Sequence, residues 1–204
     1  PYTTRVIRNT YQLLALSTAV AGVGAGISML AGFGPLAGIV FTLLGLVPLF
    51  YLHKKRNTAA AVPAMLTFTA LSGLGLGPTL SHYINMPGGS GTVLTAAVIT
   101  TAVTLALTAY VQKTGKDFSR MGGFLFAGLI VVILASIAAM FVPAMQVGVS
   151  AVAALLFSGF ILYDTSRLVR GEEDNYVMAA VSMYLNVLNL FLSVLQLLGF
   201  SSND

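Results

Sequence analysis

The sequence predicts an all-α integral membrane protein, a bundle of seven transmembrane helices that forms a single domain over residues 1–204. Hydrophobic residues make up 57% of the chain and charged residues only 8%, and the mean hydropathy is +0.90. Soluble domains carry about 25% charged residues, because water must solvate their surface. Lipid is therefore the expected solvent for most of this protein's surface.

The predicted helices lie in four long segments that contain no Asp, Glu, Lys or Arg: 9–53, 57–112, 121–163 and 175–203. A helix needs about 20 apolar residues to cross the hydrocarbon core, so the first three segments have room for two crossings each and the last for one. Gly or Pro near the middle of each longer segment, at 32–35, 85–91 and 142–144, ends one helix and lets the chain reverse. The predicted spans are 10–31, 35–52, 59–82, 92–112, 121–141, 146–168 and 176–199.

The basic residues predict the orientation of the bundle. All ten Lys and Arg lie at the N-terminus or in alternate loops between the spans. Under the positive-inside rule the N-terminus is then cytoplasmic and the C-terminus is periplasmic or otherwise outside. An odd number of spans also requires ends on opposite sides, so charge and span count agree. These bases face anionic lipid headgroups, and no nucleic-acid partner is expected.

Asp164, near the inner end of the sixth span, is the one acid or base that the sequence places clearly at membrane depth. Carboxylates at this depth tend to face the bundle interior and to mark an ion or proton path. Arg167 follows three residues later on the same helix face, so the alternative is an ion pair at the membrane interface. The sequence leaves both interpretations open.

The seventh span carries a polar face, because its polar residues are spaced by 4, 3, 4 and 3 positions. They are Ser182, Asn186, Asn189, Ser193 and Gln196. Amides cannot face lipid without a large cost, so this face is expected to point into the bundle. Its role is either hydrogen bonding between helices or the lining of a hydrated path with Asp164 near its inner mouth.

Two other motifs have mainly structural interpretations. Small residues stack in the first and third spans, and close helix packing is expected there. They are Ala21, Gly22, Gly24, Ala25 and Gly26, with Gly22 and Gly26 at GxxxG spacing, and Ser72, Gly73, Gly75 and Gly77. The adjacent acids Glu172, Glu173 and Asp174 are expected to cap and charge the start of the seventh span. A divalent-cation site at these acids is a weaker alternative.

The residue inventory disfavours enzymatic chemistry. The chain has no Cys, which excludes a thiolate nucleophile or thiolate metal site. His53 and His82 lie at opposite ends of the predicted spans, and no Lys lies within a span. We therefore expect neither an enzyme nor a bound cofactor.

Three motifs near the C-terminus carry a family resemblance. They are Tyr163-Asp164-Thr165-Ser166 at the end of the sixth span, Gly171-Glu172-x-x-Asn175-Tyr176 before the seventh, and Tyr184-Leu185-Asn186-x-x-Asn189-Leu190-Phe191 within it. These motifs resemble the Bax inhibitor-1 (TMBIM) family. The segments 8–11 and 116–123 resemble its bacterial YccA-like branch. The resemblance runs in order through nearly the whole chain.

The resemblance implies a seven-helix protein of the bacterial inner membrane that acts as a passive Ca²⁺ leak modulated by protons. In channel-like members, an Asp of the sixth span pairs with an Asp of the seventh as a proton-sensing latch. The first position corresponds to Asp164, but the second is Asn186 here, which departs from the two-acid pattern. The leading functional prediction is such a leak channel, with Asp164, Asn186 and Arg167 at the gate and the polar face of the seventh span along the path.

The YccA-like branch implies an alternative function. It is regulation or inhibition of a membrane-bound ATP-dependent protease through protein–protein contact, made by the cytoplasmic N-terminus and loops. The expected partners are then the lipid bilayer, Ca²⁺ and protons for the first function, and the protease for the second.

Overall fold

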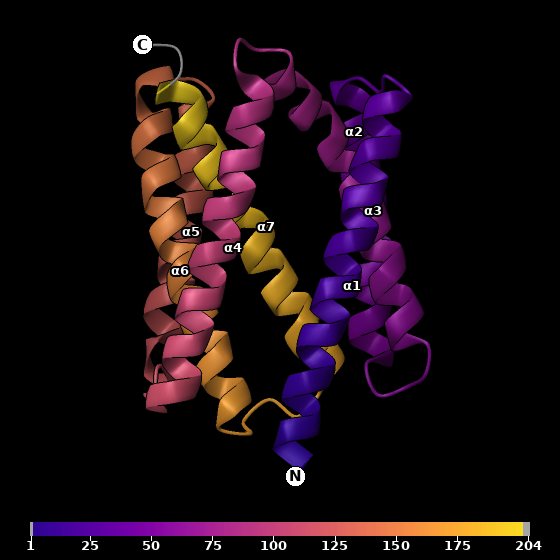
Figure 1. The fold of residues 1–204 in the computed structure, drawn as a ribbon, viewed down its shortest axis with the longest axis vertical. Coiled ribbons are helices and arrows are strands. Elements are labelled where there is room, and N and C mark those ends of the chain that lie inside the picture. Colours follow the sequence, from indigo (N-terminus) through magenta and orange to yellow (C-terminus); the bar gives the residue numbers. More distant parts are fainter. Residues whose placement is uncertain (1, 202–204) are drawn as a thin grey trace. The chain divides into compact units, whose positions relative to one another are not determined.

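The structure is a computed structural model that describes residues 2–201. Seven α-helices in this range are long and apolar enough to cross a membrane (Figure 1). They are α1 Tyr2–Leu30, α2 Pro35–Lys55, α3 Ala61–Ile84, α4 Gly89–Thr114, α5 Gly122–Ala139, α6 Gln146–Val169 and α7 Tyr176–Ser201. Short 3-10 turns, η1 Ser119–Met121 and η2 Pro143–Met145, precede α5 and α6. No strand occurs between residues 2 and 201, and the predicted all-α class with seven membrane-length helices is confirmed.

The helix ends differ from the predicted spans where the helix continues beyond the apolar segment. The helix α1 begins at Tyr2 although the predicted span begins at residue 10, because no Gly or Pro interrupts the polar residues in between. The helix α4 begins at Gly89, so two glycines that were expected in the preceding turn lie inside the helix. The turn comprises residues 85–88, and within it Gly88 has a φ of 70° that other residues rarely adopt.

The described chain groups into two compact units. Unit 1 comprises Pro1–Pro87 and Asp174–Tyr184, and unit 2 comprises Gly88–Glu173 and Leu185–Asp204. The helix α7 therefore contributes its first residues to unit 1 and the remainder to unit 2. That residues 1–204 act as a single domain stays a prediction.

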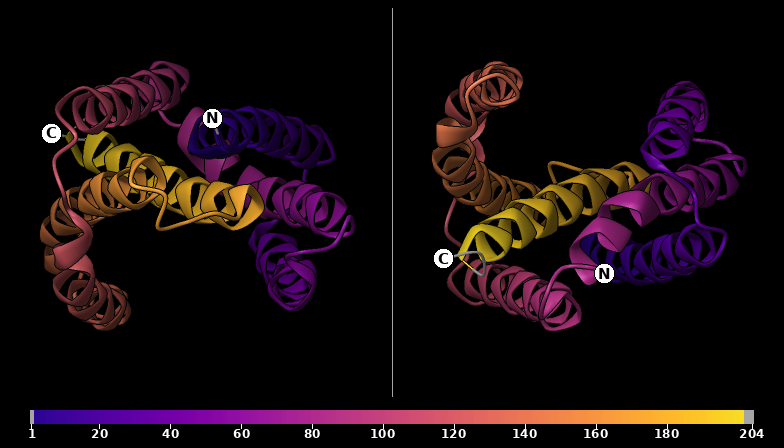
Figure 2. Two further views of the ribbon diagram at one scale, coloured as in Figure 1. Left: turned by 90° about the horizontal axis from the view of Figure 1, so that it is seen from below. Right: turned by 90° about the horizontal axis from the view of Figure 1, so that it is seen from above.

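In unit 1, α3 lies between α1 and α2 (Figures 1 and 2). The approach of α1 and α3 is close enough to require glycine. A Cβ atom placed at Gly24 would lie 2.7 Å from the carbonyl oxygen of Ala70, and one placed at Gly73 would overlap the carbonyl of Ala21. Backbone therefore packs against backbone here, which maximises van der Waals contact between membrane helices.

The packing face of α1 is not the one that the Gly22 and Gly26 spacing predicts. A Cβ at either glycine would meet no other atom within 4 Å. The neighbouring small residues Ala21, Gly24 and Ala25 are the buried ones. Both faces carry small residues in this stretch, and only the position of α3 decides between them. The predicted close packing through small residues of the first and third spans is confirmed at Gly24 and Gly73, but Gly22 and Gly26 take no part in it within unit 1.

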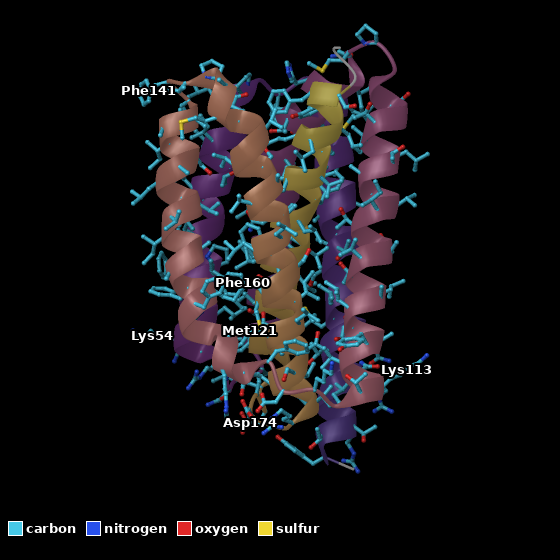
Figure 3. The ribbon with its side chains drawn as sticks, turned by 90° about the vertical axis from the view of Figure 1, so that its left-hand side faces the viewer. Lys54, Lys113, Met121, Phe141, Phe160 and Asp174 are labelled. Carbon is cyan, nitrogen blue, oxygen red and sulfur yellow. The ribbon has the colours of Figure 1, made fainter. Side chains whose placement is uncertain are left out.

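In unit 2, α6 lies between α4 and α5 (Figure 2). A Cβ at Gly159 of α6 would lie 2.8 Å from Leu125 Cδ2 of α5, so this contact is also close. Lys113 and Met121 lie at one end of these helices and Phe141 at the other (Figure 3). The basic residues that follow α4 are thus gathered at the end of unit 2 where α6 finishes.

Candidate functional site

The helices α6 and α7 bring Asp164 and Asn186 into direct contact within unit 2. The Asn186 amide nitrogen Nδ2 donates a hydrogen bond of 2.7 Å to Asp164 Oδ2. Asn186 is 6% exposed, and Asp164 is partly buried one turn before the end of α6. The bond links side chains of two different helices, so this contact ties α6 to α7. The gating or proton-sensing role of the pair stays a prediction.

Arg167 lies near Asp164 in the sequence but has contacts of its own. Its Nη2 atom is 4.0 Å from Glu173 Oε2, and its guanidinium lies over the Tyr163 ring, 5.6 Å from the ring centroid. Both side chains of the ion pair are partly exposed, so the pair contributes little to stability. These contacts direct Arg167 toward the loop after α6, and its place in a gate also stays a prediction.

Hydrogen bonds occupy most of the polar face of α7. Besides Asn186, Gln196 reaches a second helix, since its Oε1 accepts a 2.7 Å bond from Ser150 Oγ of α6. Asn189 and Ser193 donate bonds of 2.7 Å to carbonyl oxygens of their own helix, four residues earlier. Ser182 lies in the part of α7 that belongs to unit 1. The bonds of Asn186 and Gln196 thus join helices, those of Asn189 and Ser193 stay within α7, and the lining of a path stays a prediction.

The start of α7 is capped by Asn175 and not by the three acids before it. Asn175 Oδ1 accepts hydrogen bonds of 3.0 Å from the backbone N–H groups of Val177 and Met178. These are the second and third residues of the helix, which a side chain reaches only from the residue just before its start. The prediction that Glu172, Glu173 and Asp174 provide the cap is therefore wrong.

Two of those acids interact with the end of α6 instead. Glu172 Oε1 lies 3.0 Å from Arg170 Nε, and Glu173 makes the contact with Arg167 described above. Among residues 2–201, no group of three or more His, Asp or Glu side chains is arranged so that it could hold a metal ion. Glu172 and Glu173 thus pair with the arginines at the end of α6.

The loop between α4 and α5 is joined to the same end of α6. Asp117 Oδ1 accepts bonds of 2.6 Å and 2.8 Å from the hydroxyl and backbone N–H of Ser119, and its Oδ2 lies 3.5 Å from Arg170 Nη2. The bonds from Ser119, followed by the charge of Arg170, hold the pKa of Asp117 below its ordinary value. The hydrogen bond to Glu172 and the charge of Asp117 raise the pKa of Arg170. Both charges are thus maintained at neutral pH.

Two serines of α6 have contacts that no sequence pattern had indicated. Ser166, which is fully buried, accepts a 2.9 Å hydrogen bond from the backbone N–H of Phe118 and donates to the Lys116 carbonyl. Ser150 bonds Gln196, 46 residues away. Pairings across such separations depend on how the helices pack, and a single sequence carries no signal for them.

The model of a known protein family matches nearly the whole chain. The family model described as "Inhibitor of apoptosis-promoting Bax1" matches residues 3–203. The chain belongs to the Bax inhibitor-1 family. The resemblance predicted from the motifs is confirmed, and the contact between Asp164 and Asn186 joins the sixth and seventh helices of a Bax inhibitor-1 family protein.

Relatives of this Bax inhibitor-1 family protein match it along almost its whole length. It is 43% identical to an "Uncharacterized membrane protein" of Vibrio cholerae, over 99% of this chain and 92% of the relative. It is 39% identical to the Escherichia coli K12 protein named "Modulator of FtsH protease YccA", over 99% of this chain and 93% of the relative. An Escherichia coli O6:H1 relative, also 39% identical, is named "Inner membrane protein YccA". With seven membrane-length helices, this chain is a multi-pass protein of the bacterial inner membrane.

Proposed function

We propose that this protein modulates a membrane-bound ATP-dependent protease of the FtsH class through protein–protein contact. The observation that carries the proposal is the 39% identity, over 99% of this chain, to a protein named as a modulator of that protease. The match covers all seven helices, so it is not confined to one shared segment. The names of the family and of these relatives describe an inhibitor, a modulator and membrane proteins, which supports a role without catalysis.

The N-terminal turns of α1 are the proposed contact surface. Arg5 and Arg8 are exposed there, while Val6 and Thr10 are buried at 6% and 0% exposure. The buried residues anchor the turn in unit 1, and the exposed arginines are free to meet an acidic partner surface. With the N-terminus in the cytoplasm, as the positive-inside rule predicts, this surface lies on the side where such proteases hydrolyse ATP.

The test is the rate at which a reconstituted FtsH-class protease degrades a membrane substrate, with and without this chain in the same proteoliposomes. The intact protein is expected to slow degradation. The double variant Arg5→Glu/Arg8→Glu is expected to need a concentration at least about tenfold higher than the native protein to slow degradation equally. Reversing these charges across an interface costs more than about 1.4 kcal/mol of binding free energy, which is a factor of ten in affinity. These exposed substitutions are preferable to deleting the residues before Tyr11, because a deletion would also remove buried Val6 and Thr10.

The matched control reverses charge at two other exposed bases, Lys113 in the last turn of α4 and Lys116 in the loop that follows it. That control is expected to retain the effect on degradation. An intact protein that leaves the degradation rate unchanged and does not co-purify with the protease would contradict the proposal.

A second function, a passive proton-modulated Ca²⁺ leak, is supported by the contact between Asp164 and Asn186. The bond joins a membrane-depth carboxylate to a neighbouring helix. A change in the charge of Asp164 therefore changes the strength of the hydrogen bond that links α6 to α7 in unit 2. One acid and one amide occupy the positions where channel-like members carry two acids. Protonation of Asp164 alone would then be the proposed switch, with no second carboxylate to share the proton.

Asp164→Asn is expected to abolish the pH dependence of any leak, because an amide does not titrate. The measurement is Ca²⁺ entry into proteoliposomes at several pH values between about 5 and 8, the range in which most folded proteins stay stable. Asp174→Asn is the matched control, since it makes the same chemical change in the exposed loop between α6 and α7. Flux that is identical for the native protein and Asp164→Asn at every pH would rule out this function for Asp164.

A further inference from the structure

The positive charge of the protein lies mainly in unit 1. Each unit contains five of the ten Lys and Arg residues, but the described part of unit 2 also contains four acids, whereas unit 1 contains only Asp174. The net charge is therefore +4 for unit 1 and +1 for the described part of unit 2. The sequence assigns all ten bases to one side of the membrane, and only the division into units separates them.

Ion pairs increase this difference. In unit 2, Asp117, Glu172 and Glu173 pair with the arginines of α6. Among residues 2–201, no ion pair involves a base of unit 1. The uncompensated charge is densest at the end of α2 (Figure 3), where three consecutive bases are exposed. They are Lys54, Lys55 and Arg56, which we call the α2 basic cluster.

Hydrogen bonds hold the α2 basic cluster in a defined turn within unit 1. Asn175 Nδ2 donates bonds of 2.9 Å to the Arg56 carbonyl and 3.0 Å to Asn57 Oδ1. The Lys55 carbonyl accepts bonds of 2.9 Å and 2.8 Å from the backbone N–H and the hydroxyl of Thr58. These bonds use only backbone atoms of the cluster, so its charged groups are left for a ligand. An ordered backbone also lowers the entropy lost when that ligand binds.

The rotation of the last turns of α2 places a tyrosine beside the lysines. Leu52 is 0% exposed, whereas Tyr51 is 48% exposed. Residues three and four apart share a helix face, so Tyr51 lies on the same face as Lys54 and Lys55. Tyr51 is also at the inner end of the second predicted span, 35–52, where tyrosine lies at the level of the lipid headgroups. Lysine side chains at a helix end extend to the same level.

A phospholipid has the chemistry that this end of α2 can bind. Ammonium and guanidinium groups donate strong hydrogen bonds to phosphate oxygens, and the Tyr51 hydroxyl is a further donor. Above these groups, toward the membrane interior, the exposed surface of α2 is apolar, with Val47 67% and Phe50 70% exposed. A headgroup and its acyl chains match the polar and the apolar parts together, which a soluble anion does not.

We propose that the α2 basic cluster and Tyr51 bind the headgroup of an anionic phospholipid in the cytoplasmic leaflet. A zwitterionic lipid binds less well, because its headgroup carries a cation that repels the lysines. The five bases of unit 2 contribute less to this preference, because acids lie among them. The inference goes beyond both proposed functions, since it holds whether the protein modulates a protease or conducts an ion.

Fluorescence quenching tests the proposal, because the native chain has no Trp and Phe50→Trp introduces a sole indole beside the cluster. The full chain with this substitution, the reporter chain, is reconstituted in vesicles of phosphatidylcholine and phosphatidylglycerol, the latter with brominated acyl chains. Bromine quenches an indole that it contacts. Quenching against lipid composition therefore gives the preference for phosphatidylglycerol over phosphatidylcholine at this position.

The reporter chain is expected to prefer phosphatidylglycerol at least about tenfold, since each base near the membrane surface contributes about fivefold. Adding Lys54→Gln, Lys55→Gln and Arg56→Gln is expected to remove most of that preference. The matched control adds Lys113→Gln, Lys116→Gln and Arg120→Gln, which remove the same charge from unit 2, and is expected to retain it.

A preference that falls by less than about threefold in the cluster variant, or by as much in the control, overturns the proposal, because three bases are expected to contribute far more than that. A reporter chain without any preference also overturns it, and would leave the cluster to an acidic protein surface.

Two measurements on the reporter chain alone cover the case in which a triple variant does not fold. Raising the ionic strength from about 0.01 M to about 1 M shortens the Debye length from about 30 Å to about 3 Å, so the preference is expected to fall at least about threefold. Inorganic phosphate, compared with chloride at equal ionic strength, is expected to leave the preference unchanged because it has no acyl chains. A preference that is independent of salt overturns the proposal. So does one that inorganic phosphate abolishes, which would assign the cluster to a soluble anion.

Discussion

Gly73→Ala is expected to lower the free energy of unfolding by about 2–3 kcal/mol, because overpacking a close contact costs that much even when neighbours can shift. The new Cβ would overlap the carbonyl of Ala21, which is helix backbone and cannot move away as a flexible side chain would. The helices α1 and α3 must then separate or slide, and contacts along their whole interface weaken. Reversible unfolding in mixed micelles with increasing denaturing detergent measures the change.

Gly22→Ala on α1 is the matched control for this experiment. It makes the same replacement, but its Cβ meets nothing within 4 Å. Alanine is a better helix former than glycine by about 1 kcal/mol, so this variant is expected to be neutral or slightly more stable. Equal stability of the two variants would show that α1 and α3 do not approach through Gly73.

Asn186→Ala is expected to destabilise the protein by about 2 kcal/mol, since removing one partner of a buried hydrogen bond costs about 1–3 kcal/mol. The substitution leaves Asp164 Oδ2 without the donor that lies 2.7 Å away. The amide is 6% exposed, so water does not readily take its place. The same unfolding assay measures the change. If Asn186→Ala costs less free energy of unfolding in the Asp164→Asn variant than in the native protein, the two residues act as a pair.

The control for Asn186 lies on the same helix one turn later. Asn189 donates its 2.7 Å hydrogen bond to the Leu185 carbonyl of its own helix, so its removal breaks no bond between helices. Asn189→Ala is expected to cost less than about 1 kcal/mol, as for an ordinary neutral hydrogen bond. If both substitutions have the same effect, the contact of Asn186 with Asp164 contributes nothing special to stability.

The helices themselves were predictable because their cause is local. A charge-free segment of sufficient length must cross the membrane as a helix, since hydrocarbon offers no partner for backbone N–H and C=O groups. The turns were also predictable, because Gly32 and Gly88 adopt φ values of 66° and 70°, which disfavour other residues. The first helix began earlier than predicted because hydropathy marks the edge of the membrane and not the end of a helix.

The sequence predicted which residues form the candidate site, but not which of them contact one another. Placing a carboxylate or an amide in lipid costs free energy, so these groups need partners inside the protein. That requirement identifies Asp164 and the polar face of α7. The partner itself is a matter of packing, and so is the assignment of Asn175, rather than the adjacent acids, as the cap of α7. Two threonines of α4 show the same limit, because Thr100 and Thr101 are adjacent and identical in type, yet only Thr100 is buried.

By itself, the sequence determined that this protein is a seven-helix membrane protein of the Bax inhibitor-1 family, because hydropathy, charge placement and short motifs are properties of the chain read in order. Only the tertiary structure decided which face of α1 packs on α3, that Asn186 donates to Asp164, and that Thr100 is buried while Thr101 is exposed. The physical reason is that the rotation of a helix about its own axis depends on the sum of many contacts with segments distant in the sequence. Small residues on both faces of α1 leave that choice to the fit against a neighbouring helix.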